Sequence, residues 1–543
     1  MELKKNEVYE TEIIDYTTEG SGVCKIDGKV IFVPHSAVGD QVKIKILKAN
    51  KKISFGKIEE MICPSEQRIS PDCDIFGKCG GCTFRHIAYE SELRFKQKRV
   101  YDTLTRIGGI DGTVIESIVG AASCHQYRNK AQLPITTDKD GNIRVGFFAP
   151  RSHRVIPLDD CMLQSSAFAP AIRVFLEWAN SAHIKLYDEQ THSGILRHLY
   201  LRYAAKTHQL MVCVVANAKE LRKEKQLVEA LIKGIPELRT VVLNTNTEKT
   251  NVITGNQCRT LYGDGYIVDE LCGMSFRISP LSFYQVNRDQ AERLYGIAAE
   301  FADLKPHETL LDMYCGTGTI GLTMAKKVKK LIGVEIISRA IEDANQNAAL
   351  NGITNAEFIC GDASSAALSL KKRQLNPDCI ILDPPRKGCD GTLIDTIAEM
   401  TPSRVVYVSC DPATLARDVK MFSEKGYTVQ RAIPVDLFPR TVHVETVVLL
   451  RRKNIDDHIS FTWTDGEFGT KGCKATYPEL QSFILEKYGL KVSHLNIAQI
   501  KRKCGIIERE NYNMPKSDKS RQPQCTKEKE DAIMDAFKHF RLI

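Results

Sequence analysis

Apolar and polar residues alternate along the first sixty positions in a way typical of short strands. The segments EVYETEIIDYT and KVIFVPHSAVGDQVKIKIL alternate in this way between turns such as EGSG and DGK. Short strands at this spacing predict a small, five-stranded, OB-like β-barrel over residues 1–60. The pattern fits an oligonucleotide-binding barrel and a purely structural β-cap equally well.

The pattern changes after residue 61, where three cysteines in CDIFGKCGGC are followed by a helical periodicity. YESELRFKQKRVYDTLTRIG predicts a basic amphipathic helix with Leu93, Val100 and Leu104 on its apolar side. Residues 125–275 mix strands with helices, so we expect an α+β central domain over residues 61–275. Its basic stretches YRNKAQLPI and GILRHLYLR suggest phosphate or base binding, or a solvated charged face, by Arg128, Lys130, Arg197, His198 and Arg202.

Short β-rich runs alternate with helical stretches from residue 290 to residue 452. The runs are TLLDMY, KLIGVEI, AEFIC, CIILD, RVVYVSC and TVVLL. This alternation predicts a doubly wound, mostly parallel sheet, and hence a Rossmann-like domain over residues 276–453. Residues 454–543 form a separate basic extension, with predicted helices at YPELQSFILEKYG and at VSHLNIAQIKRKCG, the second capped by Ser493. It fits a helix-turn-helix unit on a phosphate backbone and a packing domain equally well.

Composition narrows the cellular setting. No apolar run approaches the ~20 residues that span a membrane, and the opening MELKKNEVYETEIIDY is charged throughout, unlike a signal peptide. We therefore expect a cytoplasmic protein without a membrane partner. In that reducing compartment the 18 cysteines are expected to be thiols, metal ligands or nucleophiles. The net charge of +8 permits a nucleic-acid partner without establishing one.

A cofactor site is predicted at LLDMYCGTGTIGL, which reads as a strand, a glycine-rich turn and a helix. Glu335 ends the next strand, where an acid can bind both hydroxyls of a ribose. Because Gly321 completes G-x-G-x-x-G, the glycine spacing fits NAD and S-adenosylmethionine alike. LDPPRKG places Asp383 and rigid backbone at the carboxyl edge of the sheet, an arrangement common in nucleic-acid methyltransferases and uncommon in dehydrogenases. S-adenosylmethionine is therefore the expected cofactor.

A nucleophile is predicted in YVSCDPATLARD, where Cys410 ends a strand and Asp411 is suited to cap the next helix. We expect the helix dipole to lower the pKa of the Cys410 thiol. Methylating C5 of a pyrimidine requires a nucleophile to add at C6, which a thiolate can do. In RTVHVETVVLL, Glu445 is expected to be ionised at pH 7 and to remove the C5 proton, with His443 orienting or binding the substrate.

Seven motifs occur in the order found in one known family: CDIFGKCGGC, SFYQVN, DMYCGTG, VEI, DPPRKG, SCDPATLARD and HVETV. Residues 1–452 thereby resemble the RNA (uracil-5-)-methyltransferases, and more narrowly their bacterial 23S ribosomal RNA branch. The resemblance implies that the barrel is a TRAM domain. It also implies roles for individual residues: Cys410 as nucleophile, Glu445 as base, and Gln285, Tyr314, Glu335, Asp383 and Asp362 as cofactor contacts.

The cysteine spacing C-x5-C-x2-C fits neither a radical S-adenosylmethionine motif nor a zinc ribbon. The family resemblance supplies Cys161 as a fourth ligand, so that Cys73, Cys79, Cys82 and Cys161 would hold a [4Fe–4S] cluster. Four thiolates would close the cluster, which suggests a structural or RNA-positioning role. By contrast, we interpret Cys389 as an incidental loop thiol and Cys315 as a packing residue.

The predicted function is S-adenosylmethionine-dependent methylation of C5 of a specific uridine in 23S ribosomal RNA by a monomeric enzyme. One alternative is a uridine in the T-loop of transfer RNA, which the barrel and the cluster disfavour because transfer-RNA relatives usually lack both. Another is an RNA-binding ribosome-assembly protein that has lost catalysis. The presence of Cys410, Glu445 and the cofactor residues disfavours that alternative.

Overall fold

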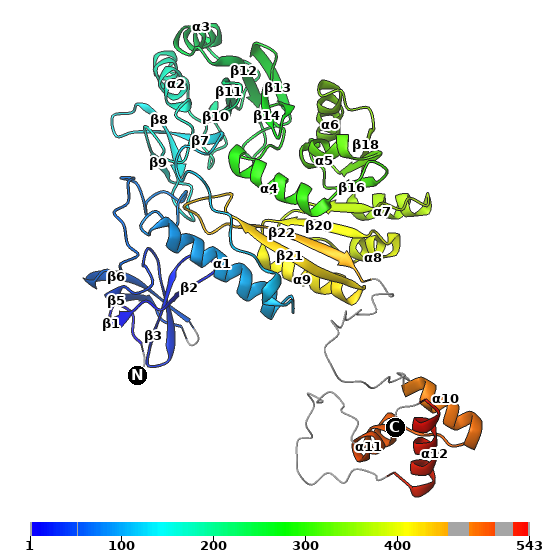
Figure 1. Cartoon of the computed structure of the whole chain (residues 1–543). Helices are drawn as coiled ribbons and strands as arrows, with labels where there is room; N and C mark the ends of the chain where they lie inside the picture. Colours follow the sequence, from blue (N-terminus) through cyan, green and yellow to red (C-terminus); the bar gives the residue numbers. More distant parts are fainter. Residues whose placement is uncertain (1–2, 51–52, 454–476, 505–524, 541–543) are drawn as a thin grey trace. The chain divides into compact units, whose positions relative to one another are not determined.

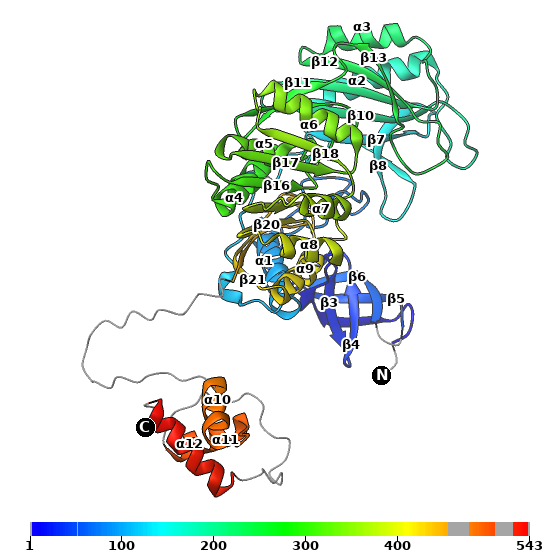
Figure 2. The same cartoon turned by 90° about the vertical axis from the view of Figure 1, so that its right-hand side faces the viewer.

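The computed structural model describes residues 3–50, 53–453, 477–504 and 525–540. The chain divides into two compact units, Met1–Ile455 and Asp456–Ile543, which are described separately (Figures 1 and 2). The finer sequence-based division at residues 60, 275 and 453 stays a prediction. No helix in the described ranges is long and apolar enough to cross a membrane.

The first unit begins with the expected barrel, but its sheet has six strands instead of five. Their order is β1-β5-β6-β4-β3-β2. The additional strand is β2, which has only two residues. Inward positions such as Ile31, Val42 and Ile44 form the buried core. The strands are Val8–Glu12 (β1), Asp15–Tyr16 (β2), Gly22–Ile26 (β3), Lys29–Val33 (β4), Gln41–Lys48 (β5) and Ile53–Cys63 (β6).

A long helix, α1 (Tyr89–Arg106), lies along β21 (Tyr427–Val435) and α9 (Pro412–Glu424) of the C-terminal part of this unit in both views (Figures 1 and 2). Val100 and Leu104 of α1 are fully buried, as their spacing predicts. Glu92 and Lys96 of the same helix are also fully buried, although the sequence pattern places charged residues on the solvent side. This helix therefore joins the N-terminal half of the unit to the C-terminal sheet.

The central part contains a mixed sheet of seven strands in the order β13-β12-β11-β10-β7-β8-β9. Side chains alternate across it, so Leu133, Leu201 and Val212 face helices α2 and α3, whereas Lys130 and Gln132 face the opposite side. The strands are Lys130–Thr137 (β7), Ile143–Phe148 (β8), Val155–Pro157 (β9), Leu196–Ala204 (β10), Gln209–Ala216 (β11), Leu238–Thr245 (β12) and Gln257–Tyr262 (β13). The helices are Phe168–Ala182 (α2) and Glu224–Gly234 (α3), with a short 3-10 helix before the sheet at Gly112–Val114.

The C-terminal sheet of this unit has the order β18-β17-β16-β19-β20-β22-β21, in which β16 to β20 are parallel and β22 is antiparallel to its neighbours. A hairpin of β14 (Ile267–Leu271) and β15 (Met274–Ile278) precedes it. The strands are Thr309–Met313 (β16), Lys330–Glu335 (β17), Ala356–Cys360 (β18), Cys379–Leu382 (β19), Arg404–Ser409 (β20), Tyr427–Val435 (β21) and Glu445–Arg452 (β22). The helices are Arg288–Ala302 (α4), Thr319–Met324 (α5), Ser338–Leu350 (α6), Ala363–Lys372 (α7), Gly391–Met400 (α8) and Pro412–Glu424 (α9), with a 3-10 turn at Ala325–Lys327.

The second unit contains helices α10 (Tyr477–Tyr488), α11 (His494–Lys503) and α12 (Lys527–His539), which pack around buried residues such as Ile484, Ile497 and Phe537. The two predicted helices and the Ser493 cap are confirmed, since Asn496 N donates to Ser493 Oγ at 3.2 Å. The polar sequence SRQPQCTKEKED predicts a loop, but its last part begins α12; residues 520–524 lie outside the described residues. Whether this unit binds a phosphate backbone as a helix-turn-helix or is a packing domain stays a prediction.

Candidate active site

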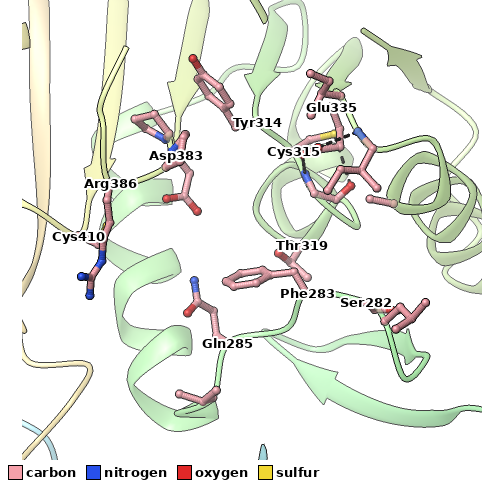
Figure 3. A pocket seen from close by; sticks show the side chains of 18 of the residues that line it. Ser282, Phe283, Gln285, Tyr314, Cys315, Thr319, Glu335, Asp383, Arg386 and Cys410 are labelled. Atoms are coloured by element: carbon pink, nitrogen blue, oxygen red, sulfur yellow. Dashed lines mark hydrogen bonds between the residues drawn. The ribbon is translucent and has the colours of Figure 1, made fainter. Parts of the chain in front are cut away.

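A cavity of about 1600 Å³ opens between the carboxyl edge of the C-terminal sheet and the central part of the chain (Figure 3). The side chains of Gln285 and Asp383 point into it, with Tyr314 and Cys410 on the surrounding elements (Figure 3). The structure brings all the predicted catalytic and cofactor-binding residues to this cavity: Gln285, Tyr314, Glu335, Asp362, Asp383, Cys410, His443 and Glu445.

The glycine turn between β16 and α5 is tightly constrained. Gly318 precedes α5 with φ of 81°, a conformation that L-residues rarely adopt. Gly321 N donates to Asp312 Oδ2 at 2.9 Å, and a Cβ at Gly321 would lie 2.7 Å from that oxygen. Tyr314 also has a left-handed backbone, with φ of 66°. A non-glycine residue held there is costly and is often found at functional sites.

Backbone groups orient the Glu335 carboxylate at the end of β17. Gly316 N donates to Glu335 Oε2 at 3.2 Å, and Ile337 N donates to Oε1 at 3.0 Å. The carboxylate retains further lone pairs that face the cavity, because each oxygen can accept more than one hydrogen bond. Glu335 can therefore bind the hydroxyls of a ribose while staying fixed by the turn.

Asp383 follows β19 at the same edge of the sheet and is partly buried. Burial raises the pKa of its carboxyl to about 7. Asp312, beneath the glycine turn, has its pKa raised to about 8 by burial, with the nearby carboxylates of Asp383 and Glu335 adding to the effect. A cavity-lining acid with a strongly raised pKa, above a second such acid beneath the glycine turn, is typical of a functional site.

Cys410 and Glu445 come together because β20 and β22 are antiparallel. Ser409 at the end of β20 pairs with Thr446 at the start of β22, so the residues next to that pair, Cys410 and Glu445, meet at one edge. Both line the cavity, as does Arg386. Arg386 Nη2 lies 3.3 Å from the His443 ring at Nδ1.

The expected lowering of the Cys410 pKa is wrong. Asp411 does cap α9, since its Oδ1 accepts from Ala413 N at 2.8 Å. Burial nevertheless raises the pKa of the Cys410 thiol to about 11, with the carboxylates of Glu445 and Asp383 adding to the effect and the Arg386 cation opposing it. Loss of hydration and two nearby acids thus outweigh the helix terminus.

The expectation that Glu445 is ionised at pH 7 is also wrong for the protein without bound ligands. Burial raises the pKa of Glu445 to about 8, and the Asp383 carboxylate adds to this, against the effect of Arg386. Burial likewise lowers the pKa of His443 to about 4, together with the Arg386 cation. His443 is therefore neutral at pH 7, and it cannot act as a cation toward the substrate.

The two predicted basic stretches lie in different environments. Arg128 and Lys130 line the cavity, and their binding of phosphate or base stays a prediction. Arg197, His198 and Arg202 are all buried, so neither phosphate binding nor a solvated face is correct for them. The reason is that β10 is an inner strand between β7 and β11. Arg202 Nη2, for example, donates to the carbonyl of Ser282 inside the protein.

The four predicted cluster cysteines lie close enough for their charges to interact. The pKa of the Cys79 thiol is raised by burial and further by the charges of Cys161 and Cys73, and that of Cys82 by burial and by Cys161. Gly81 N donates to Cys79 Sγ at 3.3 Å. Nowhere in the described ranges do three or more His, Cys, Asp or Glu side chains form a group suited to a single metal ion.

Sequence reasoning missed some cavity residues. Phe283, inside the SFYQVN motif, points into the cavity although most of its side chain is exposed (Figure 3). Val252, Thr254 and Asn256 line the cavity from a loop without a recognised motif. Cys389 is buried, and its N–H donates to Asp418 Oδ2 at 2.8 Å. It is therefore packed more closely into the protein than an incidental loop thiol would be.

Comparison with known proteins identifies the family. The family model described as tRNA (uracil-5-)-methyltransferase matches residues 88–453, and the TRAM domain model matches residues 2–58. The chain belongs to the tRNA (uracil-5-)-methyltransferase family. As such it is an S-adenosylmethionine-dependent RNA methyltransferase with an N-terminal TRAM domain and a Rossmann-like methyltransferase fold.

Several relatives are similar to this methyltransferase over most of its length. An uncharacterised RNA methyltransferase from Halalkalibacterium halodurans is 43% identical over 452 residues, covering 83% of this chain and 98% of that protein. One from Clostridium tetani is 42% identical, covering 82% and 97%. The solved Pyrococcus abyssi tRNA (uracil-54, C5)-methyltransferase, in complex with S-adenosyl-L-homocysteine, is 28% identical, with a TM-score of 0.67, covering 81% of this chain and 100% of that one.

Proposed function

We propose that this methyltransferase transfers a methyl group to C5 of a specific uridine in 23S ribosomal RNA. The observation that carries the proposal is the position of Cys410 beside Glu445 in the cavity that Glu335 and Asp383 also line. A thiol next to a carboxyl has a clear use when carbon 5 of a pyrimidine is the acceptor, and none when an amine nitrogen attacks directly. The target uracil would be flipped out of its RNA to reach this cavity.

The mechanism requires the Cys410 thiol and the Glu445 carboxyl each to lose a proton. Cys410 releases its proton to solvent, helped by the Arg386 cation. Its Sγ then bonds to C6 of the uracil while the C5–C6 π electrons form an enolate that is nucleophilic at C5. Bound S-adenosylmethionine would supply the methyl group that C5 accepts. Glu445 in its ionised form then removes the C5 proton, the electrons of that C–H bond re-form the C5–C6 double bond, and the Cys410 sulfur leaves C6 as a thiolate.

The residues proposed to hold S-adenosylmethionine fit that molecule. Glu335 is oriented toward a ribose by two backbone N–H groups. Tyr314 lies on the glycine turn and Gln285 points into the cavity from the segment before α4 (Figure 3). Asp362 caps α7, with Ser365 N donating to its Oδ1 at 3.1 Å, and so lies near the position expected for an adenine.

We also propose that Cys73, Cys79, Cys82 and Cys161 hold a [4Fe–4S] cluster. A cluster with four thiolate ligands is an anion and spreads its ligands further apart than a single ion does. Arg85 Nε and Nη2 and Arg128 Nε are buried without a hydrogen-bond partner among the described residues, and both cations interact with the cysteine sulfurs. Donors of this kind fit an anionic cluster, which would tie residues 73–82 to residue 161.

Transfer RNA is the second candidate substrate. The Pyrococcus abyssi enzyme is by name a transfer-RNA methyltransferase. Its match covers 81% of this chain, which is more than residues 61–453 make up. The presence of a barrel therefore argues less strongly against transfer RNA than the sequence suggested. We retain 23S ribosomal RNA because the cysteine motif resembles that branch, and we retain a monomer as the expected state.

The proposed function is tested by mapping 5-methyluridine in unmodified transcripts of 23S ribosomal RNA and of transfer RNA. The anaerobically purified protein is incubated with S-adenosylmethionine and each transcript. Methylation of one uridine in 23S ribosomal RNA, lost in Cys410→Ala, is the expected result. Methylation of transfer RNA alone would establish the second candidate, and no 5-methyluridine in either transcript would contradict the proposed chemistry.

A further inference from the structure

The loop of residues 246–256 joins β12 to β13 and is fastened by a buried arginine. Arg197 Nη1 donates to the carbonyl of Asn246 at 3.0 Å and to that of Glu248 at 2.8 Å. Its Nη2 donates to the carbonyl of Thr250 at 3.1 Å. Three carbonyl groups on the first half of the loop are thus held by one rigid guanidinium.

Two asparagines fasten the second half of the loop. Asn246 Nδ2 donates to the carbonyls of Val252 at 2.7 Å and Ile253 at 2.9 Å. Asn244 Nδ2 donates to the carbonyl of Gly255 at 2.8 Å, and Gly255 N donates to Asn244 Oδ1 at 2.7 Å. A Cβ at Gly255 would lie 2.0 Å from the carbonyl oxygen of Thr245. The loop therefore has a defined conformation before any ligand binds.

This fastened loop presents Val252, Thr254 and Asn256 to the cavity that contains Cys410. Among the large apolar residues of the described chain, the four most exposed are Ile336 (65%), Phe283 (61%), Val252 (60%) and Ile337 (59%). All four line this one cavity. Apolar side chains concentrated in this way mark a binding surface for flat apolar faces.

Three of the four residues come from two different parts of the fold. Ile336 and Ile337 follow Glu335, on the side proposed for the cofactor. Val252 comes from the central sheet, a different part of the fold from the strands that carry Cys410 and Glu445. In the parts of the chain that the structure describes, neither the Thr254 hydroxyl nor the Asn256 amide has a hydrogen bond to protein. Both groups are therefore free to pair with a ligand.

We propose that loop 246–256 binds the base of a nucleotide next to the target uridine in the RNA, with Val252 packing on its face and Thr254 and Asn256 hydrogen bonding to its edge. This rests on the proposed function, since it requires an RNA strand in the cavity. The three side chains carry no charge, so they suit a base better than a phosphate. Lys130 and Arg128, which also line the cavity, suit the phosphates. The loop would thereby contribute to the choice of the RNA sequence.

The test measures binding, which does not depend on methyl transfer. Dissociation constants are measured by fluorescence anisotropy for unmodified transcripts of 23S ribosomal RNA and transfer RNA, and by calorimetry for S-adenosylmethionine. Val252→Asp is expected to weaken binding of the RNA by about tenfold or more, and Thr254→Val with Asn256→Leu to weaken it while reducing discrimination between flanking bases. Binding of S-adenosylmethionine is expected to change less than about twofold.

Ile232→Asp is the matched control, because Ile232 is also an exposed apolar residue of the central part but lies on α3, away from the cavity. Unchanged RNA affinity in both loop variants would overturn the proposal. An equal loss of affinity for S-adenosylmethionine would also overturn it, because that result would place the loop in the cofactor site. A wild-type protein that binds neither transcript would overturn it as well. If RNA binding depends on Val252 but no 5-methyluridine forms, the proposed function fails, and what stands is that the loop binds RNA.

Discussion

Lys96 of α1 is the most informative residue to change outside the cavity. Its ammonium is fully buried and donates to Glu92 Oε1 at 2.7 Å, to Asp436 Oδ1 at 2.7 Å and to the carbonyl of Phe438 at 3.2 Å. Lys96→Met would leave two fully buried carboxylates without this cation. Breaking a buried ion pair from one side typically costs about 3–5 kcal/mol, and the three lost hydrogen bonds place this site at the upper end of that range.

The same change would loosen the segment that leads into β22. Glu92 Oε1 also accepts from Arg440 N at 2.7 Å, and the Arg440 carbonyl accepts from Thr83 N at 2.8 Å and Phe84 N at 3.1 Å. Phe438 and His443 of this segment line the cavity, and Glu445 follows. We therefore expect Lys96→Met to lower kcat for methyl transfer more than it alters the Kd of S-adenosylmethionine.

Lys98→Met provides the control on the same helix. The Lys98 side chain is 59% exposed and pairs with Asp15 and Asp102 at the surface, so its loss is expected to cost less than about 1 kcal/mol. Both variants are compared with wild type by urea denaturation and by kcat. If Lys96→Met is as stable as Lys98→Met, the reasoning that the Glu92–Lys96–Asp436 network supports the fold is wrong.

The stability of Lys96→Met should also depend on pH in a defined direction. Burial raises the pKa of Glu92 above its ordinary value, and the Lys96 cation opposes that shift, so the variant's Glu92 pKa rises further. The folded state then binds more protons than the unfolded state at pH values above the unfolded pKa of Glu92, and stability falls as pH rises through that range. The deficit relative to wild type should be larger at pH 8 than at pH 6.

Three further predictions concern the cavity. Glu445→Gln is expected to accumulate a covalent RNA adduct on gel electrophoresis under denaturing conditions, because the C5 proton cannot leave; absence of the adduct would remove Glu445 from that step. For wild type, kcat/KM should rise about a hundredfold per pH unit from pH 6 toward pH 8, since both the Cys410 thiol, with a pKa of about 11, and the Glu445 carboxyl, with a pKa of about 8, must lose a proton; a flat profile would contradict this. Glu335→Gln should raise the Kd of S-adenosylmethionine by about tenfold or more in calorimetry, and an unchanged Kd would exclude the ribose contact.

The strands of the C-terminal sheet could be predicted because each inner strand is a continuous apolar run ended by the residues of a motif. The strand that the sequence did not indicate is β21, YTVQRAIPV, at the edge of the sheet, where a register shift between Val429 and Arg431 interrupts the alternation. The motif residues themselves converge because parallel strands end at one edge of the sheet. Such convergence depends on topology, which the order of strands and helices already indicates.

Other features could not be predicted because their cause lies far away in the chain. Lys96 and Glu92 look like solvent-facing charges on an amphipathic helix, and the acid that they meet, Asp436, is 340 residues from Lys96. The pKa values of Cys410 and Glu445 also depend on burial, which the helix-cap signal of Asp411 does not reveal. The basic sequence around Arg197 suggests phosphate or base binding or a solvated charged face, whereas loop 246–256 supplies its hydrogen-bond partners.

The central claim is most directly tested by identifying the residue that bonds to the RNA. A 23S ribosomal RNA transcript containing 5-fluorouridine, which has no C5 proton to remove, should trap the protein when S-adenosylmethionine is present. Mass spectrometry of the digested complex is predicted to find the modified uracil on Cys410, and Cys410→Ala to form no complex while Cys272→Ala, an exposed thiol outside the cavity, forms it normally. A complex that forms equally well in Cys410→Ala would contradict the account.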